Sequence, residues 1–128
     1  MTATVSHFEI PARDPVRAAG FYRRVFGWQV KRLPWQGEVY FRVRTGAPPV
    51  PAPGGAIQGG ITSPETVGAT HPLLVIHLHG ESLADCLQRI AAAGGAVAQE
   101  PTPVGEMGRF ARFWDPEGNL LGLWQESG

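Results

Sequence analysis

A histidine and a glutamate near the start of the chain have the types and the spacing for acid–base chemistry. His7 and Glu9 are two residues apart in VSHFEIPA, where polar and apolar residues alternate, and this pattern predicts a strand over residues 5–12. Alternate side chains of a strand point to the same face, so His7 and Glu9 should lie together. Because an imidazole titrates near neutral pH, His7 could act as a general base or a hydrogen-bond donor. Glu9 could assist it or form an ion pair with an arginine at the edge of the sheet.

A second pair of histidines falls in the apolar run LLVIHLH, which predicts a strand over residues 73–79. His77 and His79 share strand parity with Val75 and should face the same side as that residue. From the residues alone, His77 is interpreted as a hydrogen-bonded histidine inside the fold. His79 should lie near the end of the strand.

The totals and the missing motifs exclude several classes of function. Eleven Lys and Arg residues balance eleven Asp and Glu residues, so no overall charge would attract nucleic acid or an anionic membrane. No apolar run approaches the roughly 20 residues of a membrane span, and charged residues interrupt the N-terminus before a signal peptide could form. The lone Cys86 suits a reducing compartment, and neither a phosphate loop nor a Gly-x-Ser-x-Gly elbow occurs. We expect a cytoplasmic protein.

Two helices and several short strands are expected to position these residues. Asp14 and Pro15 have the types of an N-cap and a first helical residue, and Gly27 predicts the end of that helix. Ser82 is the expected N-cap of the second helix. The second helix should end at residues 94–95, and further strands are predicted over 28–33, 38–44, 56–62 and 96–99. A proline-rich loop is expected over 46–55 and a polar linker over 63–72. A hairpin is predicted over 109–125, with its turn at Asp115-Pro116-Glu117-Gly118.

Aromatic and basic side chains gather around the end of the first predicted helix. Phe26 and Trp28 are interpreted as core or interface residues. The basic residues of this region are interpreted as a solvated face rather than a binding patch; they are Arg23, Arg24, Lys31 and Arg32.

The two halves of the chain match at an offset of 68 residues, each as a strand, a helix and about three strands. The matching positions are His7 and Val75, Asp14 and Ser82, and Gly27 and Gly95. At 128 residues the chain is long enough for one domain. We therefore expect a single α+β domain with one module over about residues 1–62 and a second over about residues 73–128.

The chain resembles the vicinal oxygen chelate superfamily in three stretches, which are HFEIPARDPVRAAGFYRRVFGW, AAAGGAV and GRFARFWDPEGNLLGLWQ. That superfamily contains glyoxalase I, bleomycin-resistance proteins, fosfomycin-modifying enzymes, extradiol dioxygenases and methylmalonyl-CoA epimerases. The chain is most similar to a glyoxalase-like branch with HFEIP near the start and GLW near the end. The resemblance implies two βαβββ modules whose mixed sheet curls around a cavity, with the helices outside. One fold of this kind hosts many reactions, so function must be argued from the site.

Metal-dependent members of the superfamily hold a divalent cation with His, Gln or Glu side chains at set strand positions. The resemblance carries these positions onto His7, Gln58, Val75 and Gly122. The last two residues offer no donor atom, so we expect no cofactor and no metal of the usual kind. The alternative is a metal-dependent lyase, isomerase or dioxygenase that uses His7 and Gln58 with a displaced His77.

The family resemblance also implies a ligand in the cavity. Trp124 shares parity with Gly122 and should face that cavity, where the glycine leaves room. An indole beside a glycine suits a small apolar or aromatic organic molecule. The expected protein is thus a homodimer that binds such a molecule, with His7 as the catalytic candidate and Gln58, His77, Gly122 and Trp124 as ligand-binding candidates. A sequestering protein without catalysis is a further alternative.

Overall fold

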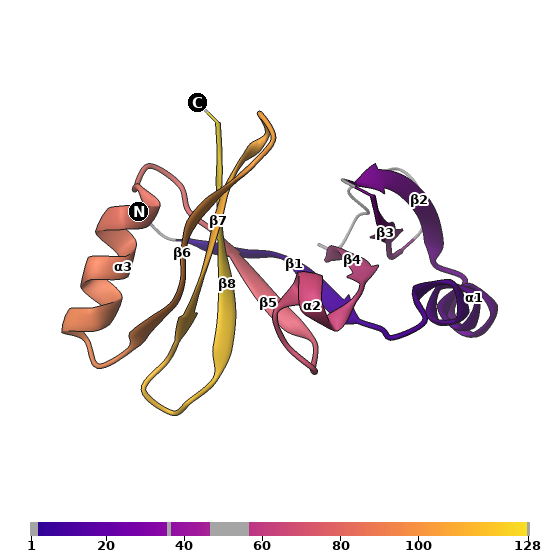
Figure 1. Cartoon of the computed structure of the whole chain (residues 1–128), viewed down its shortest axis with the longest axis horizontal. Coiled ribbons are helices and arrows are strands. Elements are labelled where there is room, and N and C mark those ends of the chain that lie inside the picture. The colour runs from indigo at the N-terminus through magenta and orange to yellow at the C-terminus, as the bar shows by residue number, and fades with distance from the viewer. Residues whose placement is uncertain (1–2, 36, 47–56, 128) are drawn as a thin grey trace. The chain divides into compact units, whose positions relative to one another are not determined.

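The computed structural model describes residues 3–35, 37–46 and 57–127. The strands are β1 (Thr4–Pro11), β2 (Gln29–Trp35), β3 (Glu38–Arg44), β4 (Gln58–Thr62), β5 (Leu73–His77), β6 (Ala96–Val104), β7 (Gly108–Trp114) and β8 (Leu120–Glu126), and the helices are α1 (Pro15–Phe26), α2 (Pro64–Val67) and α3 (Leu83–Ala92) (Figure 1). Apart from Gly46, the loop predicted over residues 46–55 lies outside the described residues, as does Ala56.

Hydrogen bonding joins the strands in the order β2-β3-β4-β1-β5-β8-β7-β6. β1 pairs with β4 and β5 pairs with β8 in parallel, and the remaining pairs within each half are antiparallel. Each half therefore repeats the same βαβββ topology, and the predicted α+β class with a mixed sheet is confirmed.

The chain divides into two compact units. We call His7–Leu73 the N-terminal unit, and Leu74–Gly128 together with Met1–Ser6 the C-terminal unit. β1 is divided between them, because its first residues belong with β5. There, Ser6 Oγ donates a hydrogen bond to the carbonyl of Val75 at 3.5 Å. None of the described helices is long and apolar enough to cross a membrane.

In the N-terminal unit, α1 begins and ends where the sequence predicts. Asp14 Oδ1 accepts a hydrogen bond from the N–H of Arg17 at 3.0 Å, and Gly27 ends the helix with a φ of 68°, which favours glycine. Ala19 of α1 packs in a core with apolar side chains of the sheet, namely Val30, Phe41, Val43 and Ile61. This core occupies one face of the strands, so residues of opposite parity lie on the other.

The C-terminal unit repeats this arrangement with different residues. Ser82 Oγ accepts a hydrogen bond from the N–H of Asp85 at 3.1 Å, as expected of an N-cap. The apolar stripe of α3 packs against β7 and β8, and Figure 1 shows the helix lying alongside the strands of this unit. The buried residues of this core are Leu78, Leu83, Cys86, Leu87, Ala111, Phe113 and Leu123.

The turn between β7 and β8 has the predicted tight geometry. Asp115 Oδ1 accepts hydrogen bonds from the N–H groups of Glu117 and Asn119, each at 2.9 Å. A hydrogen bond from the Asn119 side chain at 2.8 Å, followed by these backbone bonds, holds the pKa of Asp115 below its ordinary value. Gly118 has a φ of 83°, which explains the glycine at this position.

Among the differences from the sequence-based expectation, three concern α2, β5 and β6. The predicted linker contains the single helical turn α2, capped by Ser63 and ended by Gly68, and four residues are too few to show a helical period. β5 ends at His77, two residues early. β6 continues to Val104 through two prolines, which is tolerated because β6 is at the edge of the sheet.

Candidate functional site

The face of the N-terminal sheet opposite the α1 core is lined by polar side chains. Strand register places His7 beside Gln58 and Glu9 beside Gly60. Gly60 is in turn paired with Arg42 of β3, and Tyr40 has the same parity as Arg42. We call these six residues the polar face: His7, Glu9, Tyr40, Arg42, Gln58 and Gly60.

The carboxylate of Glu9 is the centre of the hydrogen bonding on the polar face. The Tyr40 hydroxyl donates to it and lies 3.2 Å from both carboxylate oxygens. His7 Nε2 lies 3.2 Å from Oε1 of the same group. The side chains of His7 and Glu9 are 29% and 18% exposed, so they remain accessible to solvent. The prediction that His7 and Glu9 share a face is confirmed, and here Glu9 pairs with His7.

Gly60 allows Tyr40 and Glu9 to meet over β4. A Cβ atom at this position would lie 2.0 Å from the Tyr40 hydroxyl oxygen and 2.8 Å from Oε2 of Glu9. Both distances are far inside van der Waals contact, so no larger residue fits without moving these groups. The glycine is therefore part of the site, because it makes room for the pair.

The surroundings of Tyr40 keep its hydroxyl protonated. Burial raises the pKa of the Tyr40 phenol, and the negative charge of Glu9 and the hydrogen bond to it act in the same direction. Tyr40 is thus a hydrogen-bond donor throughout the neutral range. In the tautomer of His7 that carries its proton on Nε2, the ring donates to Glu9 and Nδ1 is the acceptor.

Gln58 is engaged with the backbone beyond the end of β3. Its Oε1 accepts a hydrogen bond from the N–H of Thr45 at 2.6 Å, and its Nε2 donates to the carbonyl of Thr45 at 3.3 Å. The amide therefore bridges the end of β3 to β4 next to His7. Gln58 is thus the neighbour of His7 in register, and its amide atoms are used in holding the backbone.

Arg42 places a cation among these groups. Its Nε is buried, and no partner for it occurs among the described residues. Arg42 is paired with Gly60 on one side and with Lys31 on the other, so two cationic residues are neighbours in this row, with Glu9 beyond Gly60. A buried donor without a partner is energetically costly, and an acceptor from a ligand would relieve that cost.

The corresponding face of the C-terminal unit is dominated by rings. Register places Val75 beside Gly122 and His77 beside Trp124. β7 continues the two rows with Arg112 beside Gly122 and Phe110 beside Trp124. We call these six residues the aromatic face: Val75, His77, Phe110, Arg112, Gly122 and Trp124.

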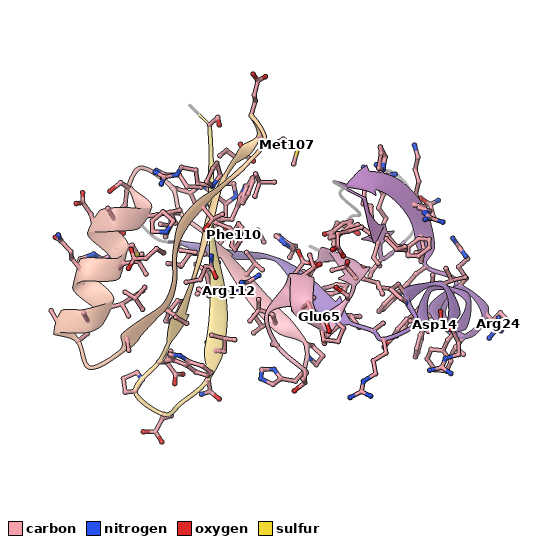
Figure 2. All side chains as sticks on the ribbon, viewed as in Figure 1. Asp14, Arg24, Glu65, Met107, Phe110 and Arg112 are labelled. Atoms are coloured by element: carbon pink, nitrogen blue, oxygen red, sulfur yellow. The ribbon has the colours of Figure 1, made fainter. Side chains whose placement is uncertain are left out.

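Contacts on the aromatic face fix the positions of its larger side chains. The Trp124 ring covers Gly108, where a Cβ would lie 2.7 Å from the indole. The guanidinium of Arg112 lies 4.8 Å from the centre of the Phe110 ring, a cation–π contact, and Figure 2 shows both side chains on β7. The indole and phenyl rings thus form an ordered apolar surface.

The two histidines of this unit are stacked on each other. The ring centres of His77 and His79 are 4.4 Å apart, and Nε2 of His79 lies 3.0 Å from the hydroxyl of Thr4. Their common parity is as predicted. His79 follows the end of β5 and is exposed, in agreement with its predicted place near the strand end.

The structure brings the predicted residues together in pairs and adds residues that the sequence did not single out. His7 lies beside Gln58, and His77 lies beside Trp124. Sequence reasoning missed Tyr40 and Gly60. The alternation of β3 placed Tyr40 opposite Val39 and Phe41, but it carried no signal that the hydroxyl reaches Glu9, 31 residues away.

Within the described residues, no group of three or more His, Cys, Asp and Glu side chains is placed to hold a metal ion. Of the four ligand positions implied by the family resemblance, Val75 and Gly122 lie side by side and have no donor side chain.

The model of the Glyoxalase/Bleomycin resistance protein/Dioxygenase superfamily matches residues 4–123, and the chain belongs to this family. No curated protein sequence matches the chain. The family agrees with the resemblance seen in the sequence, and the match extends over both units.

Solved structures with this fold include two methylmalonyl-CoA epimerases. The enzyme from Mycobacterium tuberculosis is 18% identical with a TM-score of 0.66, covering 100% of this chain and 94% of that one. A variant of the Streptomyces coelicolor enzyme in complex with 2-nitronate-propionyl-CoA is 16% identical with a TM-score of 0.68, covering 100% and 97%. A hypothetical protein from Bacillus halodurans is 14% identical with a TM-score of 0.69, covering 100% and 97%. At these identities, the similarity shows the fold alone.

Proposed function

We propose that this member of the superfamily binds a small apolar or aromatic organic molecule on its aromatic face, without a resident divalent metal. The observation that carries the proposal is the pairing of Val75 with Gly122 on neighbouring strands. At two positions where metal-dependent relatives are expected to place ligands, this chain has an aliphatic side chain and a glycine. Such a pair offers space and apolar contact, and it offers no ligand atom.

The residues around this pair suit a flat ligand. Trp124 provides a large ring for stacking, held in place over Gly108. His77 beside it can donate or accept one hydrogen bond and so orient a polar substituent. A few polar groups on a mainly apolar surface are typical of small-molecule sites.

For any reaction that the protein catalyses, we propose His7 as the residue that transfers the proton. Glu9 holds the ring through Nε2, and Nδ1 then accepts the proton. Tyr40 is a positioning residue in this proposal, since it contacts Glu9. Gln58 is the neighbour of His7 in register. It would therefore lie beside the substrate group whose proton His7 transfers.

The binding proposal is tested by tryptophan fluorescence with 2-naphthol as the probe. We expect saturable quenching in the wild type and its loss in Trp124→Ala. Trp28→Phe is the matched control, because Trp28 stacks on Tyr22 at 4.9 Å in the N-terminal unit and should leave the quenching intact. Quenching that persists unchanged in Trp124→Ala would contradict the proposal.

The second candidate function is that of a metal-dependent lyase, isomerase or dioxygenase. It is favoured by the placement of His7 beside Gln58, two side chains with ligand atoms. Metal analysis of protein purified without a chelating tag separates the two candidates. Stoichiometric metal that disappears in His7→Ala would establish the second and reject the first.

A further inference from the structure

Three basic side chains lie on the same side of the N-terminal sheet as the polar face. Phe41 and Val43 of β3 pack in the α1 core, so Arg42 and Arg44, which alternate with them, project from the opposite side. Lys31 of β2 is paired directly with Arg42 and shares its side of the sheet. Lys31 is exposed and the two arginines are half-buried, so solvent reaches all three. We call these three residues the basic trio.

No ion pair joins the basic trio to any of the described residues. Glu9 is in the same row as Arg42, but its carboxylate accepts from Tyr40 and lies beside Nε2 of His7. Glu38, at the start of β3, accepts a hydrogen bond from α2. The carboxylates on this side of the sheet are therefore used by other donors, and the trio keeps its positive charge.

Arg42 carries two energetic costs that the described fold does not offset. Its Nε is buried and has no hydrogen-bond partner among the described residues. Its register partner on β2 is Lys31, and like charges placed directly opposite each other destabilise a sheet. An anion that accepts hydrogen bonds from the guanidinium removes both costs, because it supplies the missing acceptor and the missing negative charge.

The charges around Arg42 favour a carboxylate over a phosphate. The planar fork of a guanidinium fits either group with two parallel hydrogen bonds. Glu9 lies in the same row, however, and repels an anion in proportion to its charge. A phosphate monoester carries about 1.5 to 2 negative charges at neutral pH, whereas a carboxylate carries one. Arg44, roughly 7 Å further along β3, adds a second guanidinium without a second carboxylate beside it.

We propose that the basic trio binds the carboxylate of a small organic acid, with Arg42 as the hydrogen-bond donor and Arg44 and Lys31 supplying further positive charge. The site lies wholly within the N-terminal unit. It is distinct from the binding proposed on the aromatic face, and it requires no reaction to follow. The chemical class of the ligand is therefore a monoanionic carboxylic acid.

Nuclear magnetic resonance of the full chain tests the proposal at the Nε–H of Arg42 itself. Butyrate is the probe, and butyramide is the matched neutral control of the same size and shape. We expect the Arg42 Nε–H signal to shift saturably with butyrate and to stay in place with butyramide. A shift that does not saturate, an equal shift with butyramide, or tighter binding of inorganic phosphate than of butyrate would overturn the proposal.

Calorimetric titration of variants with butyrate provides a second test. Arg42→Gln should raise the dissociation constant at least about tenfold, because charge-assisted hydrogen bonds are lost. Arg42→Lys keeps the charge but removes the fork, so it should also weaken binding. Arg44→Gln, on a half-buried side chain, should weaken binding by about threefold and tests the site even where an Arg42 variant does not fold.

Arg32→Gln is the control for the loss of one positive charge in the same unit. Arg32 is exposed and is paired with Phe41, so it lies on the side of the sheet away from the basic trio. Butyrate affinity should be unchanged in this variant. Weakening as large as that of Arg42→Gln would show that only the overall charge matters, and wild-type affinity in Arg42→Lys would reject the hydrogen bonds assigned to the guanidinium.

Discussion

The N-terminal and C-terminal units share one topology, yet their sheet faces opposite the cores differ in chemistry. In the N-terminal unit, this face has a carboxylate that accepts hydrogen bonds from Tyr40 and lies within hydrogen-bonding distance of His7. In the C-terminal unit, the corresponding face has Trp124 beside His77 and a glycine beside Val75. The repeat thus provides the same scaffold twice, and the residues of β1, β3, β5 and β8 decide what each copy can do.

This difference also separates the two proposed activities. Proton transfer is assigned to the polar face, where an oriented imidazole is available. Binding of an apolar molecule is assigned to the aromatic face, where the Trp124 ring packs on Gly108 and Arg112 contacts the Phe110 ring. Each assignment can be tested in its own unit, with the other unit as the reference.

The largest expected effect concerns the two cores. Ile61→Ala in the N-terminal unit and Leu83→Ala in the C-terminal unit remove side chains that are 0% and 1% exposed. Each should lower the free energy of unfolding by about 2–5 kcal/mol, because a cavity adds to the lost apolar burial. Urea unfolding followed by circular dichroism measures both. A loss below about 1 kcal/mol in only one of them would show that the cores are not equivalent.

The next effect tests the close packing of the polar face. Gly60→Ala should lower the free energy of unfolding by about 1–3 kcal/mol, since the added Cβ would overlap the Tyr40 hydroxyl. Gly20→Ala is the control, because its Cβ meets only the flexible end of Arg24 and it lies inside α1, where alanine is favoured by roughly 1 kcal/mol. Equal stabilities of the two variants would contradict the close approach at Gly60.

Removal of the Tyr40 hydroxyl should have a smaller effect that depends on pH. Tyr40→Phe should cost about 1.5 kcal/mol at neutral pH, because Glu9 loses a donor. The raised pKa of folded Tyr40 also sets the direction of the pH dependence. Above the ordinary tyrosine pKa of about 10, Tyr40 ionises in the unfolded chain before it ionises in the folded one. The free energy of unfolding of the wild type therefore falls as the pH rises.

Urea unfolding at neutral and alkaline pH measures this effect. Both tyrosines of the chain lie in the N-terminal unit, so Tyr22→Phe is the control and should retain the alkaline decrease. If Tyr40→Phe loses stability in alkali as steeply as the wild type, the burial of the phenol is not responsible.

The smallest effect compares the helix caps of the two units. Asp14→Ala and Ser82→Ala remove equivalent hydrogen bonds to the N–H groups of Arg17 and Asp85, at 3.0 and 3.1 Å. Each should cost about 1 kcal/mol. Thermal unfolding of the two variants measures the costs, and a much larger loss for one cap would break the equivalence of the modules.

Much of the fold could be predicted from the sequence because its signals are local. Caps such as Asp14 and Ser82, the glycine at position 27 and the turn at Asp115 act over a few residues and indicate where elements begin and end. The short helix α2 was missed because one turn has no period, and the extension of β6 was missed because proline is tolerated only at an edge that the sequence does not reveal.

The site was predictable only in part, for the same reason. Strand parity placed His7 with Glu9 and His77 with His79, since alternation is a property of each strand alone. The family resemblance carried two ligand positions onto Val75 and Gly122 without pairing them, and the strand register places the two residues side by side.

By itself, the sequence determined the α+β class, the two-module repeat and the types of residue available for chemistry. Only the tertiary structure decided that Tyr40 donates to Glu9, that Gly60 makes room for this contact, and that the Gln58 amide holds Thr45. The Tyr40–Glu9 contact joins residues 31 positions apart, and the Gln58–Thr45 contact joins residues 13 positions apart. Both connect strands whose register is not specified by any local pattern. Local propensity selects the elements, whereas the register and packing of those elements select which side chains meet.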